Sequence, residues 1–294
     1  MTTKSPPSAL ESYLRLPPET SLILLTSTLG CSVNWLTARF IGSALQNLQA
    51  SASSEGSEGD GGKDVAVLVV SWMRDLKFWQ DEVRRVAGID ISKPLYAKRF
   101  GFVDRLNTPP STSTNLQETQ SRISSAISKL CTSTSSSEET QDGPKILLIL
   151  DQPDLVLATG HPTLTSQDLS TFLLNLRSLP QIHSTYLSLS ADLPLITAAS
   201  SELSPSRTSP LETESAAFVV TQAHASRVIF SVRELETGAA KDVSGVLRIT
   251  RGGDYFAVGG DDDDGDEDGD EVKEVELLYL LQRDGGLKVF QRGE

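Results

Sequence analysis

Residues 65–71 read VAVLVVS, and residues 146–151 read ILLILD. Both runs are apolar at nearly every position, so a strand formed by either run needs apolar cover on both of its faces. Such runs are typical of central strands in a parallel sheet that is covered by helices on both sides. The two runs therefore predict an α/β fold.

The same alternation continues on both sides of these runs. Helical patterns separate the apolar runs, and strand–helix alternation implies right-handed βαβ units. The predicted parallel strands are Ser21–Thr28, Val65–Ser71, Ile146–Asp151, Thr185–Ser190 and Arg227–Val232. The predicted helices are Val33–Leu48, Leu76–Val86, Leu116–Leu130, Ser166–Leu179 and Leu211–His224.

The pattern changes after residue 232. Three strand-like runs follow, at Val246–Arg251, Val275–Gln282 and Leu287–Gln291, and Asp-Gly-Gly at 284–286 is a hairpin signal. We therefore expect a mostly parallel sheet that is extended at one edge by antiparallel strands.

Several segments cannot contribute to a core, because they are rich in Ser, Gly, Pro, Thr or acidic residues. The prediction is a flexible leader over residues 1–20 and one domain over residues 21–294. Disordered inserts are predicted near 51–63, 132–143, 199–210 and 259–272.

The net charge of −13 is concentrated in one segment. Residues 261–276 contain eleven acidic residues and one lysine, which gives −10 and leaves about −3 for the rest of the chain. The low overall isoelectric point therefore says little about the folded surface.

The chain has 294 residues and only two cysteines, Cys31 and Cys131, and its N-terminus lacks the pattern of a signal peptide. No apolar run reaches the ~20 residues that a membrane span needs. These features favour a reducing compartment. We expect the cytoplasm, or the cytoplasm and the nucleus, and no membrane partner.

A phosphate-binding loop would lie between the first predicted strand and its helix. Such a loop needs glycines, a lysine for the phosphates and Ser or Thr for Mg²⁺. Here the loop has one glycine and no lysine, and Gly30, Ser32 and Asn34 occupy the phosphate-loop positions. The sequence therefore predicts a degenerate phosphate loop and no bound nucleotide cofactor.

Asp151 ends a strongly apolar strand, as does the carboxylate that helps to hold Mg²⁺ in P-loop enzymes. It is a Walker-B-like residue by position, but the pattern is common in α/β proteins and favours a simpler role for Asp151 as the cap of a turn before Pro153. We predict no metal site, because the histidines lack metal-ligand spacing and both calcium-loop frames in the acidic segment break.

Two further segments carry a family resemblance. Residues 24–36 read LLTSTLGCSVNWL, and residues 69–79 read VVSWMRDLKFW. Together with the strand that ends at Asp151, they resemble Elongator complex subunit six over roughly residues 20–235.

The resemblance implies a RecA-like domain that forms a hetero-hexameric ring with Elongator subunits four and five. The ring belongs to the machine that modifies the wobble uridine of tRNA and so affects translation, and tRNA binds at the level of the ring. The chain would be a non-catalytic accessory subunit, and no residue is predicted to be catalytic.

Two groups of residues are candidates for contacts with partners. The basic residues Arg74, Lys77, Arg84 and Arg85 are candidates for tRNA or an acidic partner surface. The aromatic residues Trp72, Phe78 and Trp79 could lie in the core or at an interface.

Two other functions stay open from the sequence. One is a divergent P-loop NTPase, against which the missing lysine argues. The other is a RecA-like DNA-repair accessory factor, which needs basic or aromatic loops that the Ser- and Pro-rich loops here do not supply.

Overall fold

A single sheet organises the described part of the chain. The computed structural model describes residues 7–53, 65–107, 114–134, 144–160, 163–198, 208–238, 240–258 and 272–291. Within these residues the strand order is β3-β2-β4-β5-β1-β6-β7-β8-β9. The strands are β1 (Leu22–Ser27), β2 (Val65–Ser71), β3 (Phe100–Asp104), β4 (Lys145–Asp151), β5 (Ile182–Ser190), β6 (Val228–Arg233), β7 (Gly245–Arg251), β8 (Val275–Leu281) and β9 (Leu287–Gln291).

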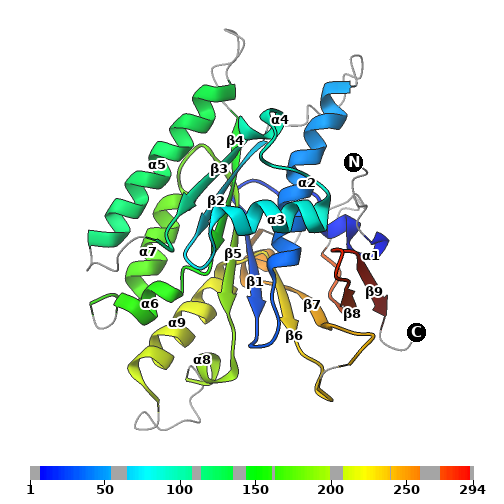
Figure 1. The fold of residues 1–294 in the computed structure, drawn as a ribbon. Helices are drawn as coiled ribbons and strands as arrows, with labels where there is room; N and C mark the ends of the chain where they lie inside the picture. The colour runs from blue at the N-terminus through cyan, green and yellow to red at the C-terminus, as the bar shows by residue number, and fades with distance from the viewer. Residues whose placement is uncertain are drawn as a thin grey trace.

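Helices lie on both faces of this sheet (Figure 1). The longer helices are α2 (Asn34–Ser53), α3 (Leu76–Ala87), α5 (Thr114–Thr134), α7 (Ser166–Arg177) and α9 (Pro210–Ala225). The shorter ones are α1 (Ser8–Glu11), η1 (Ser12–Leu14, a 3-10 helix), α4 (Pro94–Ala97), α6 (Leu155–Gly160), α8 (Leu193–Thr197) and α10 (Gly253–Val258).

The predicted mixed sheet is confirmed. Strands β3, β2, β4, β5, β1 and β6 pair in parallel, whereas β7, β8 and β9 add antiparallel pairs. Gly285 has φ +83° in the predicted hairpin between β8 and β9. Strand β3 was not predicted, because its sequence FGFVD is short, contains a glycine and is mostly half-buried.

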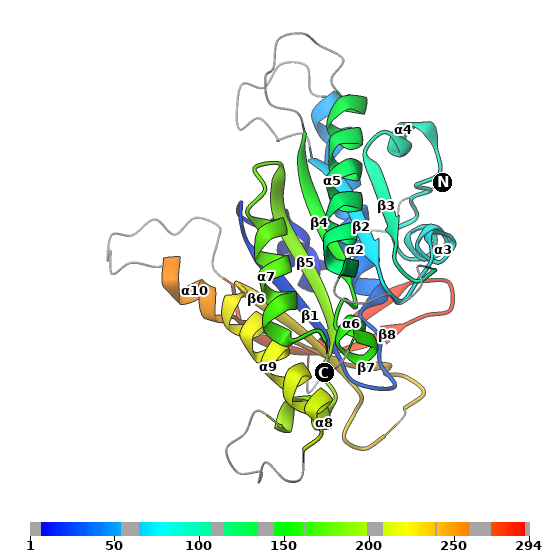
Figure 2. The ribbon, with the colours of Figure 1, turned by 90° about the vertical axis from the view of Figure 1, so that its left-hand side faces the viewer.

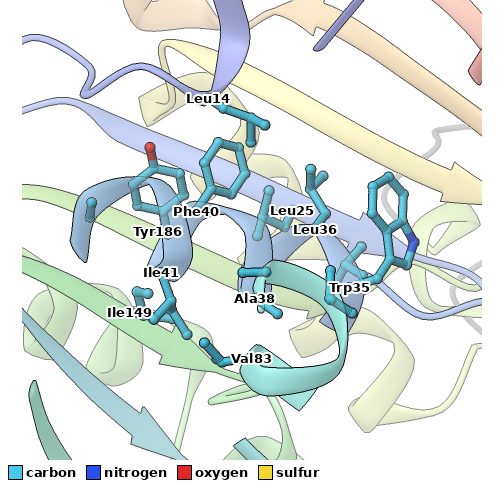
Figure 3. Packing of buried hydrophobic residues seen from close by; sticks show 14 of the residues in the cluster. Leu14, Leu25, Trp35, Leu36, Ala38, Phe40, Ile41, Val83, Ile149 and Tyr186 are labelled. Carbon is cyan, nitrogen blue, oxygen red and sulfur yellow. The ribbon is translucent and has the colours of Figure 1, made fainter. Parts of the chain in front are cut away.

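Two apolar cores fill the space between the sheet and its helices. One core joins α2 and α3 to one face of the sheet, and Figure 3 shows Phe40 and Ile41 of α2 against Tyr186 and Ile149 of the strands. The other core joins α5, α7 and α9 to the opposite face, and Figure 2 shows these helices along one side of the strands. This two-sided cover explains why β2 and β4 are apolar at consecutive positions.

The N-terminal segment differs from the flexible leader that the sequence suggested. From residue 8 it forms α1 and η1, and Leu10 and Leu14 are buried at 1% and 6% exposure. Ser43 Oγ donates a hydrogen bond to the carbonyl of Leu14 at 2.8 Å. Two apolar residues four positions apart are enough to fix this segment against α2, although its composition gives no long periodic signal.

Most residues of the four predicted inserts lie outside the described part of the chain, as do residues 261–271 of the acidic segment. Among the described helices, none is both long enough and apolar enough to cross a membrane.

Candidate functional site

The carboxyl ends of the parallel strands bring the predicted site residues to one edge of the sheet. In register, Ser71 of β2 lies beside Asp151 of β4, and Asp151 lies beside Ser188 of β5. Strand β1 ends at the next position along this edge and leads into the loop that precedes α2. Ligands of open α/β sheets bind at this edge, so we call it the carboxyl edge.

The loop between β1 and α2 uses its amides inside the protein. The Leu29 N–H donates to Asp192 Oδ1 at 2.6 Å, and the Cys31 N–H donates to the Thr28 carbonyl at 3.0 Å. The Asn34 N–H donates to Ser32 Oγ at 3.2 Å. In a functional phosphate loop these donors would face the phosphates. Here the carboxylate of Asp192 already occupies one of them.

A second carboxylate lies against the same loop. Gly30 has φ +90°, and a Cβ added to it would clash with Glu234 Oε1. Burial raises the pKa of the Cys31 thiol, and the charge of Glu234 raises it further, against a hydrogen bond from Tyr279 that lowers it. With Asp192 and Glu234 at Leu29 and Gly30, the loop has a negative environment that opposes phosphate binding.

Asp151 is present at the Walker-B-like position but is fully engaged by the protein. It is 1% exposed and accepts hydrogen bonds from Ser71 Oγ at 2.6 Å and Ser188 Oγ at 3.1 Å. Arg74 Nη1 lies 3.0 Å from Asp151 Oδ1. The guanidinium thus supplies the positive charge that a Mg²⁺ ion would supply in an NTPase.

Asp154 is a buried carboxylate that the sequence analysis missed. The residue keeps some exposed surface, but its Oδ1 is buried and accepts no hydrogen bond within the described residues. Burial raises its pKa to about 6, against a lowering effect of the Ser190 N–H, which donates to Oδ2 at 3.1 Å. Its sequence signal was the short spacing from Asp151 in the string DQPD.

The four predicted basic residues do not form one surface patch. Arg74 turns inward to Asp151, and its guanidinium also lies 5.3 Å from the centre of the Phe78 ring. Lys77 pairs with Asp81 at 3.2 Å and Arg85 pairs with Glu82 at 2.7 Å, each within α3. Arg84 is exposed in the last turn of the same helix.

The aromatic candidates divide between the two cores. Trp79 is completely buried in the core under α3, and Trp72 is 9% exposed in the core on the opposite face. Phe78 is half-buried and meets the Trp79 ring edge-on, with 5.4 Å between ring centres. Only Phe78 therefore retains substantial surface for a partner.

The carboxyl edge carries exposed apolar side chains that were not among the predicted basic and aromatic candidates. Leu29 follows β1 and is 86% exposed, and Leu193 follows Asp192 and is 72% exposed. Met73 and Leu106, which follow β2 and β3, are 44% and 48% exposed. Apolar side chains thus protrude where a nucleotide-binding protein would present polar groups to its ligand.

Comparison with known proteins addresses the fold. No protein-family model matches the sequence, and no curated protein matches it. The crystal structure of flagellar accessory protein FlaH from Methanocaldococcus jannaschii is similar, with TM-score 0.58, 10% identity, and coverage of 98% of this chain and 97% of that chain. KaiC-like protein PH0186 from Pyrococcus horikoshii OT3 has TM-score 0.52, 14% identity, and coverage of 93% and 91%.

The fold is RecA-like. This confirms the predicted architecture, and at these identities the likeness extends to the fold alone. Within that RecA-like frame, the loop after β1 and the acid at the end of β4 occupy the positions from which nucleotide chemistry is normally carried out.

Proposed function

We propose that this chain is a non-catalytic assembly subunit that uses its carboxyl edge to bind other RecA-like subunits. The observation that carries the proposal is that the groups which would bind phosphate and Mg²⁺ already have partners within the protein. Arg74 neutralises Asp151, and Asp192 occupies the Leu29 amide. Phosphate and Mg²⁺ would have to displace both groups, so hydrolysis of ATP by the isolated chain is not expected.

The exposed leucines give this edge a second use. Large exposed apolar side chains that gather on one surface mark interaction sites. The hydrogen bond between Leu29 and Asp192 places Leu29 near Leu193, although they follow different strands. Burial of each leucine at an interface would contribute roughly 1.5–3 kcal/mol.

The partners that we propose are Elongator subunits four and five, in a hetero-hexameric ring. The support for them is the resemblance of residues 24–36 and 69–79, on a fold that is RecA-like. The ring would bind tRNA for wobble-uridine modification, in the cytoplasm or in both cytoplasm and nucleus. The segment with charge −10 would repel tRNA phosphates, so we assign tRNA binding to the ring rather than to this segment.

The test is co-expression of the full chain with subunits four and five from the same source, followed by size-exclusion chromatography with light scattering. We expect a stoichiometric complex with the mass of a six-membered ring. If the other two subunits associate while this chain elutes alone, the assembly proposal is wrong.

A variant pair locates the interface. Leu29→Asp combined with Leu193→Asp should weaken ring assembly at least tenfold, because charged groups would have to be buried. The matched control is Leu174→Asp on α7, since Leu174 is also exposed, at 61%, but lies away from the carboxyl edge. Equal assembly of both variants would remove the carboxyl edge from the interface.

An NTPase assay distinguishes the assembly subunit from the alternative function, a divergent P-loop NTPase. We expect no hydrolysis of ATP with Mg²⁺ by the isolated chain. Hydrolysis that is abolished by Asp151→Ala would instead establish a divergent NTPase.

A further inference from the structure

A separate cavity lies beneath the N-terminal segment, away from the carboxyl edge. Its volume is about 310 Å³, which is within the range of small-molecule sites. Ile23 and Val228, near the starts of β1 and β6, form part of its floor, whereas the degenerate phosphate loop follows the end of β1. The cavity and the degenerate site are therefore at opposite ends of the same strands.

The roof of the cavity is fixed by specific contacts. The Tyr13 hydroxyl donates to the Lys273 carbonyl at 2.7 Å, which ties the N-terminal segment to the start of the β8 region. Tyr13 also meets Phe230 edge-on, with 6.2 Å between ring centres. The cavity is thus enclosed between the N-terminal segment, the residues before β8 and strand β6, which contact one another.

The walls of the cavity are aromatic. Phe40 and Tyr186 lie with their ring centres 4.5 Å apart, and Phe40 lies 5.5 Å from Phe230. Together with Tyr13, these rings line the cavity. Flat aromatic walls favour a flat apolar ligand, because rings stack offset or edge-on over such surfaces.

Tyr186 provides a buried polar group at the base. The residue is 3% exposed and lines the cavity. Figure 3 shows the Tyr186 hydroxyl directed away from Ile41, with Phe40 beside the ring. Burial raises the pKa of this phenol, so it remains a donor at neutral pH. A hydrogen-bond acceptor of a ligand in the cavity would accept from this hydroxyl.

The residues that line the cavity also carry positive charge. They include Arg15, Arg227 and Lys273, and no acidic residue is among the described lining residues. Arg15 and Lys273 are exposed, whereas Arg227 is half-buried and lies 5.2 Å from the centre of the Tyr255 ring. Arg15 and Lys273 thus lie near solvent, whereas Tyr186 is buried.

We propose that this cavity binds a small aromatic carboxylic acid that carries a hydrogen-bond acceptor on its ring. The ligand ring packs against the Phe40, Tyr186 and Phe230 side chains where they line the cavity, the ring acceptor accepts from the Tyr186 hydroxyl, and the carboxylate faces Arg15 at the mouth. The inference is independent of ring assembly, because no residue of the carboxyl edge takes part.

The experiment is calorimetric titration of the full-length chain with 6-methoxy-2-naphthylacetate. Two analogues test the two polar interactions separately. One, 2-naphthylacetate, lacks the ring acceptor, and the other, 2-(6-methoxy-2-naphthyl)ethanol, lacks the negative charge. Two protein variants each remove the protein group that would contact the ligand group missing from one analogue. Tyr186→Phe removes only the hydroxyl, and Arg15→Gln removes only an exposed charge, with Arg283→Gln at another exposed arginine as its control.

We expect the methoxy acid to bind the wild-type chain with 1:1 stoichiometry. Tyr186→Phe should weaken this binding about tenfold but leave 2-naphthylacetate unchanged, since only the methoxy compound uses the hydroxyl. Arg15→Gln should weaken the acid about three- to fivefold and the neutral alcohol not at all, because the charge acts only on the carboxylate. Arg283→Gln should bind like wild type.

Three results of these titrations would overturn the proposal. One is the absence of binding at millimolar concentrations of the methoxy acid. Another is equal weakening of both acids by Tyr186→Phe, and the third is the same effect for Arg15→Gln and Arg283→Gln. A Leu16→Trp variant, which fills the cavity from its roof, checks the location, and unchanged binding there would also refute the site.

Discussion

Arg74 and Asp151 form an ion pair across the carboxyl ends of two neighbouring strands, with 3.0 Å between Nη1 and Oδ1. Their side chains are 19% and 2% exposed. Ser71 links them, because its hydroxyl donates to Asp151 and accepts from the Arg74 N–H at 2.9 Å. A carboxylate in the position used for Mg²⁺ is thereby held by the protein itself.

Replacement of Arg74 should destabilise the fold. Arg74→Met leaves the charge of Asp151 buried without a cation, and we expect the free energy of unfolding to fall by about 3 kcal/mol. Urea denaturation measures it. Lys77→Met is the control, because the Lys77–Asp81 pair is exposed and its loss should change stability by less than about 0.5 kcal/mol.

The double variant Arg74→Met/Asp151→Asn separates charge from packing. Asn keeps an acceptor oxygen for one of the two serine hydroxyls and presents an amide donor to the other, but it needs no cation. Most of the stability lost in Arg74→Met should therefore return. If the double variant is as unstable as the sum of the single variants, Arg74 acts through packing and not through its charge.

Gly30 should tolerate alanine less well than Gly238 does. Both glycines have positive φ, +90° and +87°, but Gly238 has nothing within 4 Å of an added Cβ, whereas Gly30 faces Glu234. Gly238→Ala should cost about 1 kcal/mol from backbone strain alone. Gly30→Ala should cost more in urea denaturation, and Glu234→Ala should remove the difference if Glu234 is its cause.

The main strands could be predicted from the sequence because each is marked by a clear apolar run. Strands β2 and β4 are apolar on both faces, and Asp151 ends one of these runs, so its position at the sheet edge followed directly. Strand β3 was missed because a half-buried edge strand with a central glycine lacks this signal. The absence of lysine from the loop after β1 was also visible in the sequence.

The sequence could not provide the partners of these groups. Asp192 and Glu234 reach the loop after β1 from positions more than 160 residues away in the chain. Arg74 looked like a surface cation, because its inward direction depends on the register that sets Ser71 beside Asp151. Long-range pairings of this kind follow from topology and not from local patterns.

The N-terminal segment should be an integral part of the fold. Leu14→Ala removes a buried side chain and should lower the free energy of unfolding by roughly 2–4 kcal/mol. Leu95→Ala is the control, since Leu95 is 62% exposed and its loss should have little effect. Equal and small effects of both changes would mean that residues 8–14 only rest on the surface.

Asp154 should make the protein less stable as the pH rises. Burial raises its pKa in the folded chain to about 6 from an ordinary value of 3.8, so between these pH values the folded state binds more protons than the unfolded state. Stability from this group therefore falls as the pH rises through that window, and the cost is fully present above about pH 6.

Asp154→Asn tests this directly, because Asn cannot ionise but can still accept from the Ser190 N–H. At pH 7.5 the variant should be more stable than wild type by about 2–3 kcal/mol, and near pH 4 the two should be equal. Urea denaturation at both pH values gives the difference, in which the effects of other carboxylates cancel. Asp81→Asn, at an exposed position, should show no such pH-dependent gain. A constant difference between wild type and Asp154→Asn at both pH values would assign the effect to packing rather than to the buried charge.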